Sequence, residues 1–121
     1  MEKNNIWWKS IHINMNGCND NVKDPEKIKK FIEELCTNIN MNKHWPLYLE
    51  RFWYWNLEWY SCMQFIETSS ITCHFDEQNW KNNRAFIDIF SCKDFNSEMT
   101  EKFCIKYFQA KELKSTTLDR K

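Results

Sequence analysis

Residues 70–92, SITCHFDEQNWKNNRAFIDIFSC, contain two stretches in which the side chains alternate along the chain. From Ser70 to Phe75 every second residue is apolar, and from Arg84 to Cys92 the residues alternate again, with large groups on both faces. An alternation with a period of two is typical of β-strands, because successive side chains of a strand point to opposite faces. We therefore predict two neighbouring strands, joined by a polar loop from Asp76 to Asn83.

The chain before these strands predicts a further strand and a helix. Ser10 to Asn16 alternates in the same way, and Gly17 to Lys23 has the composition of a turn. Asp24 and Pro25 then indicate a helix start, because aspartate caps the first amides and proline fits the first turn. The apolar residues that follow are spaced for one helical face: Ile28, Phe31, Ile32, Leu35 and Ile39.

Aromatic residues crowd the segment from His44 to Tyr60. They follow no clean period, and Pro46 argues against one uninterrupted helix. We predict a loop and a short strand for this segment. The residues from Tyr60 to Glu67 are expected to be extended.

The C-terminal part adds a second helix and a last strand. Ser97 is predicted to cap a helix that ends near Ala110, and a short strand is predicted near Thr116 to Leu118. The resulting order of elements is typical of an α+β fold. We predict one domain, residues 1–121, built as a two-layer sandwich of an antiparallel sheet with two helices packed on one face.

Composition and charge exclude several classes of function. The 121 residues with 42% hydrophobic content fit a single domain with one core. The formal net charge is zero, which argues against nucleic acid and acidic membranes as partners. Gly17 is the single glycine, so the chain cannot form glycine-rich phosphate loops. No apolar run approaches the roughly 20 residues that span a bilayer.

The six cysteines predict thiols rather than disulfides or a metal site. Residues Glu2 to Asn5 contain no apolar stretch of the signal-peptide type, which favours a cytoplasmic, reducing location. No two cysteines have C-x-x-C spacing and the three histidines lie far apart, so we expect no metal. Five cysteines are expected to be buried without an assigned role: Cys18, Cys36, Cys62, Cys73 and Cys104.

Four residues carry a resemblance to a known family: Ser61, Ser69, His74 and Cys92. By these residues the chain resembles the small prokaryotic-type S-adenosylmethionine decarboxylases, which are pyruvoyl enzymes made by self-cleavage of a proenzyme. In that family a serine at the place of Ser69 becomes the pyruvoyl group, and a histidine at the place of His74 serves processing. A serine at the place of Ser61 assists processing, and a cysteine at the place of Cys92 donates a proton.

The resemblance implies chemistry that these residue types can perform. Ser69 Oγ would attack the Thr68 carbonyl and exchange the amide for an ester, and His74 would remove the Ser69 α-proton. The chain would divide between Thr68 and Ser69, leaving as cofactor a covalent pyruvoyl group derived from Ser69. That group would serve as the electron sink for loss of carbon dioxide, and the Cys92 thiol would protonate the substrate.

The resemblance also implies S-adenosylmethionine as substrate, a role in spermidine synthesis, and a homodimer of processed protomers. Trp53, Tyr54 and Trp55 are candidate partners for the adenine and the sulfonium cation. Glu77 resembles the family's carboxylate that binds the ribose. Packing in the core or at a subunit interface is an alternative interpretation of the aromatic residues. Asp88 also has two interpretations, lining of the site or a cross-strand salt bridge.

The sequence departs from the family pattern at the cleavage site. The family has Glu-Ser-His there, whereas this chain has Thr68-Ser69-Ser70, with Glu67 one place earlier. The loop after His74 is longer and lacks the family's Trp-Pro. Three alternatives remain open: the same chemistry on ornithine or arginine, an unprocessed relative that binds a nucleoside or a partner subunit, and Ser70 as the reacting serine.

Overall fold

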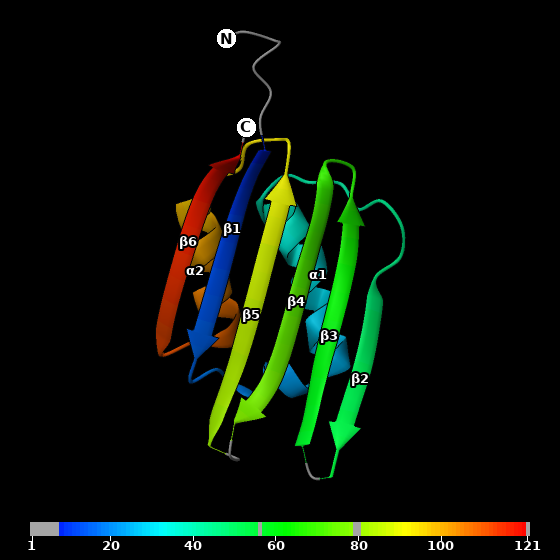
Figure 1. The fold of residues 1–121 in the computed structure, drawn as a ribbon, viewed down its shortest axis with the longest axis vertical. Helices are drawn as coiled ribbons and strands as arrows, with labels where there is room; N and C mark the ends of the chain where they lie inside the picture. Colours follow the sequence, from blue (N-terminus) through cyan, green and yellow to red (C-terminus); the bar gives the residue numbers. More distant parts are fainter. Residues whose placement is uncertain (1–7, 56, 79–80, 121) are drawn as a thin grey trace, which may run out of the picture.

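The computed structural model describes residues 8–55, 57–78 and 81–120. Six strands form one antiparallel sheet in the order β2-β3-β4-β5-β1-β6, and two helices cover one of its faces (Figure 1). The strands are β1 (Trp8–Asn16), β2 (Tyr48–Tyr54), β3 (Leu57–Ile66), β4 (Ser69–Gln78), β5 (Asn82–Ser91) and β6 (Glu112–Arg120). The helices are α1 (Pro25–Asn38) and α2 (Ser97–Phe108), and a short 3-10 helix, η1 (Asp20–Lys23), precedes α1. The predicted two-layer α+β sandwich is confirmed.

Both helices begin at capped ends. The Asp24 carboxylate accepts hydrogen bonds from two amides of the first turn of α1, and Pro25 is the first helical residue, as predicted. The cap predicted for α2 is wrong, because the Asn96 side chain accepts from the Met99 amide and Ser97 is already helical. Asparagine and serine cap about equally well, so the adjacent pair did not reveal which of them begins the helix.

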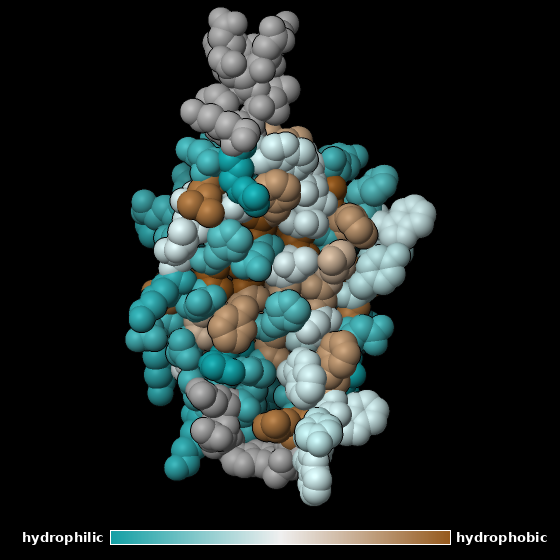
Figure 2. All heavy atoms as spheres, in the orientation of Figure 1, coloured by the Kyte–Doolittle hydropathy of each residue, from teal (hydrophilic) through white to brown (hydrophobic). Residues whose placement is uncertain are grey.

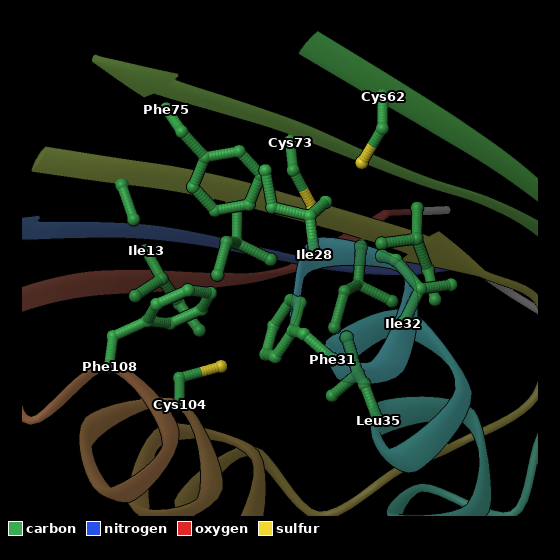
Figure 3. Close-up of a cluster of buried hydrophobic side chains, with 14 of the residues drawn as sticks. Ile13, Ile28, Phe31, Ile32, Leu35, Cys62, Cys73, Phe75, Cys104 and Phe108 are labelled. Atoms are coloured by element: carbon green, nitrogen blue, oxygen red, sulfur yellow. The ribbon is translucent and has the colours of Figure 1, made fainter. Parts of the chain in front are cut away.

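The core lies between the sheet and the two helices (Figure 3). Alternate residues of β1, β4 and β5 point into it and meet the apolar stripe of α1. Phe31, Phe75 and Phe108 are buried there, and the Phe108 ring lies 4.7 Å from Phe31 and 5.4 Å from Phe75 between centroids. This layer sets the register of the strands, because a shift by one residue would turn their apolar side chains out of the core.

Several strands are longer than predicted. The aromatic segment, expected to form a loop and a short strand, is an edge hairpin made of β2 and the first part of β3. Nearly all of β2 is exposed on both faces, so its residues have no alternation that would reveal a strand. The loop predicted from Asp76 to Asn83 is shorter, and β6 extends beyond Thr116 to Leu118 on both sides. Pairing with a neighbouring strand, which is a tertiary effect, decides these bounds.

The second face of the sheet, which we call the open face, carries no helix (Figure 1). Figure 2 looks onto this face, where apolar and aromatic side chains gather over β2 to β5. Large exposed residues on it are Trp8, Tyr48, Phe52, Tyr54, Leu57, Met63, Phe65 and Leu118. Such a gathering on a small protein is typical of an interaction surface.

The helices of the described ranges are too short or too polar to cross a membrane. Residues Glu2 to Asn5, on which the predicted reducing location depends, lie outside the described residues.

Candidate functional site

β3 and β4 place Ser61 and His74 directly opposite each other on the open face. The Ser61 Oγ lies 2.7 Å from His74 Nδ1, which is hydrogen-bond distance. Both residues alternate with the buried Cys62 and Cys73, so the sheet register itself holds the pair on the solvent side. Because Ser61 engages Nδ1, Nε2 is the ring nitrogen left for proton transfer.

The predicted cleavage site lies at the tight turn between β3 and β4. Ser69 is the first residue of β4 and pairs with Ile66 on β3 and with Ser91 on β5. The carbonyl oxygen of Thr68 accepts a hydrogen bond from the backbone N–H of Cys92 at 3.2 Å. An N–H aimed at a carbonyl oxygen stabilises the negative charge that forms when a nucleophile attacks that carbonyl. The residue that follows β5 thus places an N–H donor on the carbonyl of the peptide bond before Ser69.

The two parts of the predicted site lie apart within one chain. Ser69 and His74 are on the same extended strand, and their separation in sequence corresponds to about 16 Å. Ser69 begins β4 beside the end of β5, whereas His74 lies further along the strand beside Ser61. The structure brings Ser61 to His74 and Thr68 to Cys92, but it does not bring His74 to Ser69.

β3 and β4 diverge toward the β2–β3 hairpin (Figure 1). A pocket lies beside His74 at this end of the two strands. The pairing of the two strands ends at Trp59 and Asp76, and the pocket of about 310 Å³ begins there. Its lining residues are Leu57, Glu58, Trp59, His74, Phe75, Asp76, Glu77 and Phe86. The rings of Trp59 and Phe86 were not predicted as site residues. Strand parity places both on the face of His74, and that signal could have found them.

Each carboxylate at this pocket is paired with a basic side chain. Arg84 donates two hydrogen bonds to Asp76, at 2.8 and 2.6 Å, and this hydrogen bonding raises the pKa of the Arg84 guanidinium. The other two pairs are Lys23 with Glu77 and Arg51 with Glu58. The charges of the pocket are therefore balanced within the chain, and aromatic rings are the main surface left for a ligand.

Glu77, the residue predicted to bind ribose, lies on the opposite face of β4 from His74. It borders the pocket, but strand alternation turns it toward the helix side, where its carboxylate pairs with Lys23. A second pocket, of about 220 Å³, lies on that side and includes Glu77 and Lys23. The carboxylate is thus engaged by a lysine rather than presented beside the imidazole.

The three predicted aromatic binding residues lie at the end of the β2–β3 hairpin. Trp53 is on the face of β2 opposite to the open face, with the Arg51 guanidinium 5.1 Å from its ring centroid. Tyr54 and Trp55 contact each other at 6.2 Å between centroids, and Trp55 is 85% exposed. None of the three is among the described residues that line the pocket beside His74.

Cys92 is exposed, whereas the other five cysteines are buried, as predicted. Burial raises the pKa of Cys104 to about 12 and that of Cys18 to about 11. Buried thiols that keep their protons are poor nucleophiles and poor metal ligands. Among the described residues no group of histidines, cysteines and carboxylates could hold a metal ion.

Asp88 belongs to a second polar group on the open face. Its Oδ1 lies 3.1 Å from His12 Nδ1, and His12 Nε2 lies 3.2 Å from Ser10 Oγ. Of the two interpretations of Asp88, the structure shows the cross-strand pair. Ser10 is only 2% exposed, so its hydroxyl is not accessible to a substrate.

These features define a class of protein, a two-layer α+β fold whose sheet carries a hydrogen-bonded serine–histidine pair. A second serine, Ser69, follows a turn whose carbonyl accepts a hydrogen bond from a backbone N–H. The chain belongs to the S-adenosylmethionine decarboxylase family, whose sequence profile matches residues 9–121, and members of this family are carboxy-lyases. Among solved structures, the adenosylmethionine decarboxylase from Aquifex aeolicus VF5 has a similar fold, with a TM-score of 0.76. The match covers 95% of this chain and 91% of that chain at 15% sequence identity. No curated protein matches the chain in sequence.

Proposed function

We propose that the chain is a pyruvoyl-dependent decarboxylase of S-adenosylmethionine that matures by self-cleavage between Thr68 and Ser69 and supplies spermidine synthesis. The observation that carries this proposal is the hydrogen bond from the Cys92 amide to the Thr68 carbonyl. It polarises the peptide bond that maturation must break. Membership of the family supplies the type of reaction.

Maturation begins with attack on the peptide bond before Ser69. The Ser69 hydroxyl attacks the Thr68 carbonyl carbon, the Cys92 amide stabilises the oxyanion, and the C–N bond breaks to give an ester and an amine. A base then removes the Ser69 α-proton, and the bond from Cβ to oxygen breaks, which releases the Thr68 carboxylate and leaves dehydroalanine. This residue tautomerises and reacts with one water, releasing ammonia and leaving the pyruvoyl group at the new amino end.

His74 is the base of the second step, and Ser61 orients its ring. The hydrogen bond at Nδ1 leaves Nε2 to accept the α-proton. Because β4 holds His74 about 16 Å from Ser69 of its own chain, the acting histidine comes from a second chain.

The open face is the surface through which two chains pair. Ser61 and His74 lie on it among exposed apolar side chains. Two sheets packed face to face about a two-fold axis that crosses β4 between Ser69 and His74 place His74 of each chain over the Ser69 backbone of the other, while strand alternation turns the Ser69 side chain to the helix side. A two-fold dimer repeats every contact, so both chains gain a complete site.

Decarboxylation takes place at the same turn after cleavage, at the new amino end formed from Ser69. The pyruvoyl group supplies an electron sink that allows carbon dioxide to leave the substrate. The residues present fit this group, because Ser69 begins β4 next to the end of β5, where Cys92 is exposed. The Cys92 thiol donates the proton that replaces the carboxylate. Trp59 and Phe86 offer ring faces to the adenine and the sulfonium cation.

The contacts predicted for Trp53, Tyr54, Trp55 and Glu77 stay predictions. Tyr54 lies on the open face at the end of the hairpin, where a second chain would pass. Its contribution therefore depends on the dimer.

An intact mass spectrum of freshly purified protein tests the proposal. Two fragments are expected, residues 1–68 and residues 69–121, the second lighter than its sequence by one ammonia. Processed protein is then assayed in parallel for release of carbon dioxide from labelled S-adenosylmethionine, ornithine and arginine, and we expect release from the first alone. Release from ornithine or arginine alone would keep the chemistry and replace the substrate. A chain that stays intact would instead indicate the non-enzymatic relative.

A further inference from the structure

The turn before Ser69 is held from two sides by residues that the proposed reaction does not use. On one side, in the loop between α1 and β2, the Asn42 carbonyl accepts a hydrogen bond from the Glu67 amide at 3.0 Å. The Asn42 side chain also donates to the Glu67 carboxylate at 2.9 Å. On the other side lies the end of β5, where Ser91 pairs with Ser69. Two segments from distant parts of the chain thus hold the turn between them.

Ser91 is completely buried and belongs to a chain of hydrogen bonds that passes through Thr68. The Lys93 amide donates to Ser91 Oγ at 2.9 Å, and the Ser91 hydroxyl lies 2.9 Å from Thr68 Oγ1 and 3.0 Å from the Lys93 carbonyl oxygen, so it has two acceptors. The Thr68 hydroxyl donates to the Met41 sulfur at 3.2 Å. The next residue of the chain, Cys92, donates its amide to the Thr68 carbonyl. Two consecutive residues at the end of β5 therefore hold the side chain and the carbonyl of one residue.

We propose that Ser91 is a positioning residue for self-cleavage, whose hydroxyl holds Thr68 so that its carbonyl stays against the Cys92 amide. The inference rests on the proposed function, because it concerns the rate of that same cleavage. Threonine carries its hydroxyl on Cβ and is stiff at χ1, so a hydrogen bond to Oγ1 also restrains the backbone beside the carbonyl. Attack on a carbonyl requires one geometry, and restraint before the attack increases its rate.

This role gives a reason for the departure of the cleavage site from the family pattern. The family's glutamate has its polar atoms far from the backbone, whereas the Thr68 hydroxyl lies within reach of Ser91. The short side chain is therefore anchored to β5 directly. The hydrogen bond between the Ser91 and Thr68 hydroxyls thus restrains the turn before Ser69.

A purely structural Ser91 would stabilise the end of β5 without affecting cleavage. Its loss costs stability in either case, because the Lys93 amide loses its partner. Thr100 offers a matched control, since its buried hydroxyl in α2 donates to the Asn96 carbonyl at 2.8 Å. Thr100→Val removes a hydroxyl of equal burial and leaves the turn untouched.

The test measures the rate constant of self-cleavage in chains made by cell-free synthesis, so that each chain is followed from its intact state. Ser91→Ala and Thr68→Val are each expected to slow cleavage about tenfold, the effect of one lost hydrogen bond. The double variant should be no slower than either single variant, because both substitutions remove the same hydrogen bond. Thr68→Ser, which keeps the hydroxyl, and Thr100→Val should cleave at nearly the wild-type rate.

Thermal unfolding of each variant in a Ser69→Ala background, which is expected to stay intact, measures stability separately from cleavage. A Ser91→Ala chain that cleaves as fast as wild type overturns the inference and leaves the proposed function standing. Additive slowing in the double variant, or equal slowing in Thr100→Val, overturns it as well, because either result shows effects other than the shared hydrogen bond. A wild-type chain that never cleaves removes the proposed function and this inference with it.

Discussion

The backbone amide of Cys92 donates to the carbonyl oxygen of Thr68 at 3.2 Å, while the side chain of the same residue is exposed at the end of β5. One residue thus offers a backbone group to maturation and a thiol to turnover. The two groups act in different steps of the proposed function. Substitutions at this position can therefore separate the two steps.

Cys92→Ala keeps the amide and removes the thiol. We expect this variant to cleave itself at nearly the wild-type rate and to lose decarboxylation by about 100-fold or more, the usual contribution of a general acid. Mass spectrometry measures the first effect and release of labelled carbon dioxide the second. An alanine variant with full turnover would show that another group donates the proton.

Cys92→Pro removes the amide proton, and Cys92→Ala serves as its control. We expect the proline variant to slow cleavage by about 100-fold, as found for loss of an oxyanion donor. Circular dichroism of the purified chain establishes whether the fold is kept. A folded proline variant that cleaves at the wild-type rate would exclude a role for the amide.

The separation of Ser69 and His74 along β4 predicts complementation between two inactive chains. Ser69→Ala is expected to stay intact because it lacks the nucleophile, and His74→Ala because it lacks the base. In mixed dimers the His74→Ala chain keeps its serine and receives a histidine from the other chain, so we expect that chain alone to be cleaved. A tag on one chain distinguishes the products on a denaturing gel. If co-expression restores no cleavage, the arrangement of the site across two chains is wrong.

Met63 is 39% exposed on the open face, where a second chain is proposed to pack. We expect Met63→Lys to favour the monomer, because an interface would bury the new charge without a partner. Ile105→Lys is the matched control, since Ile105 is 38% exposed but belongs to α2. Sedimentation velocity measures the oligomeric state. A wild-type protein that sediments as a monomer at micromolar concentration would contradict the proposed dimer.

Burial of Cys104 makes the stability of the fold sensitive to alkaline pH. The pKa of this thiol is raised from its ordinary 9.0 to about 12 in the folded chain. Below pH 9 both states keep the proton, whereas above it the unfolded chain loses the proton first, so stability falls between pH 9 and pH 12. We expect the free energy of unfolding to decrease by about 1 kcal/mol more per pH unit in wild type than in Cys104→Ala over this range.

Urea unfolding at pH 8, 9 and 10 measures that difference. Other titrating groups are common to both proteins and cancel in the comparison. Equal slopes for wild type and Cys104→Ala would mean that the thiol titrates in the folded state as it does in the unfolded chain.

Local patterns in the sequence predicted the strands and the helix whose side chains form the core. The alternation from Ser10 to Asn16 and the stripe of α1 gave correct elements, because each pattern records which side of the element faces the core. The aromatic hairpin was predicted poorly for the same reason. Residues such as Trp53 and Trp55 are exposed, so no core selects their spacing.

The candidate site was only partly accessible from the sequence. Ser61, Ser69, His74 and Cys92 were identified by the resemblance to the family, and their proposed roles stay predictions. Ser91 and the Cys92 amide were not found, because a buried hydroxyl and a backbone N–H leave no distinctive mark in a sequence. Trp59 and Phe86 were not predicted as site residues, because the pocket that they line forms only when β3, β4 and β5 come together.

The sequence by itself determined the α+β class, the start of α1 and the family, since alternation, capping and motifs depend on the order of residues along the chain. Only the tertiary structure decided that Ser61 meets His74 and that the end of β5 reaches Thr68. These contacts join residues from different strands, and the register that pairs them is set by how the whole sheet packs on its helices. The extended backbone of β4 keeps His74 about 16 Å from Ser69, which is why the proposed site needs a second chain.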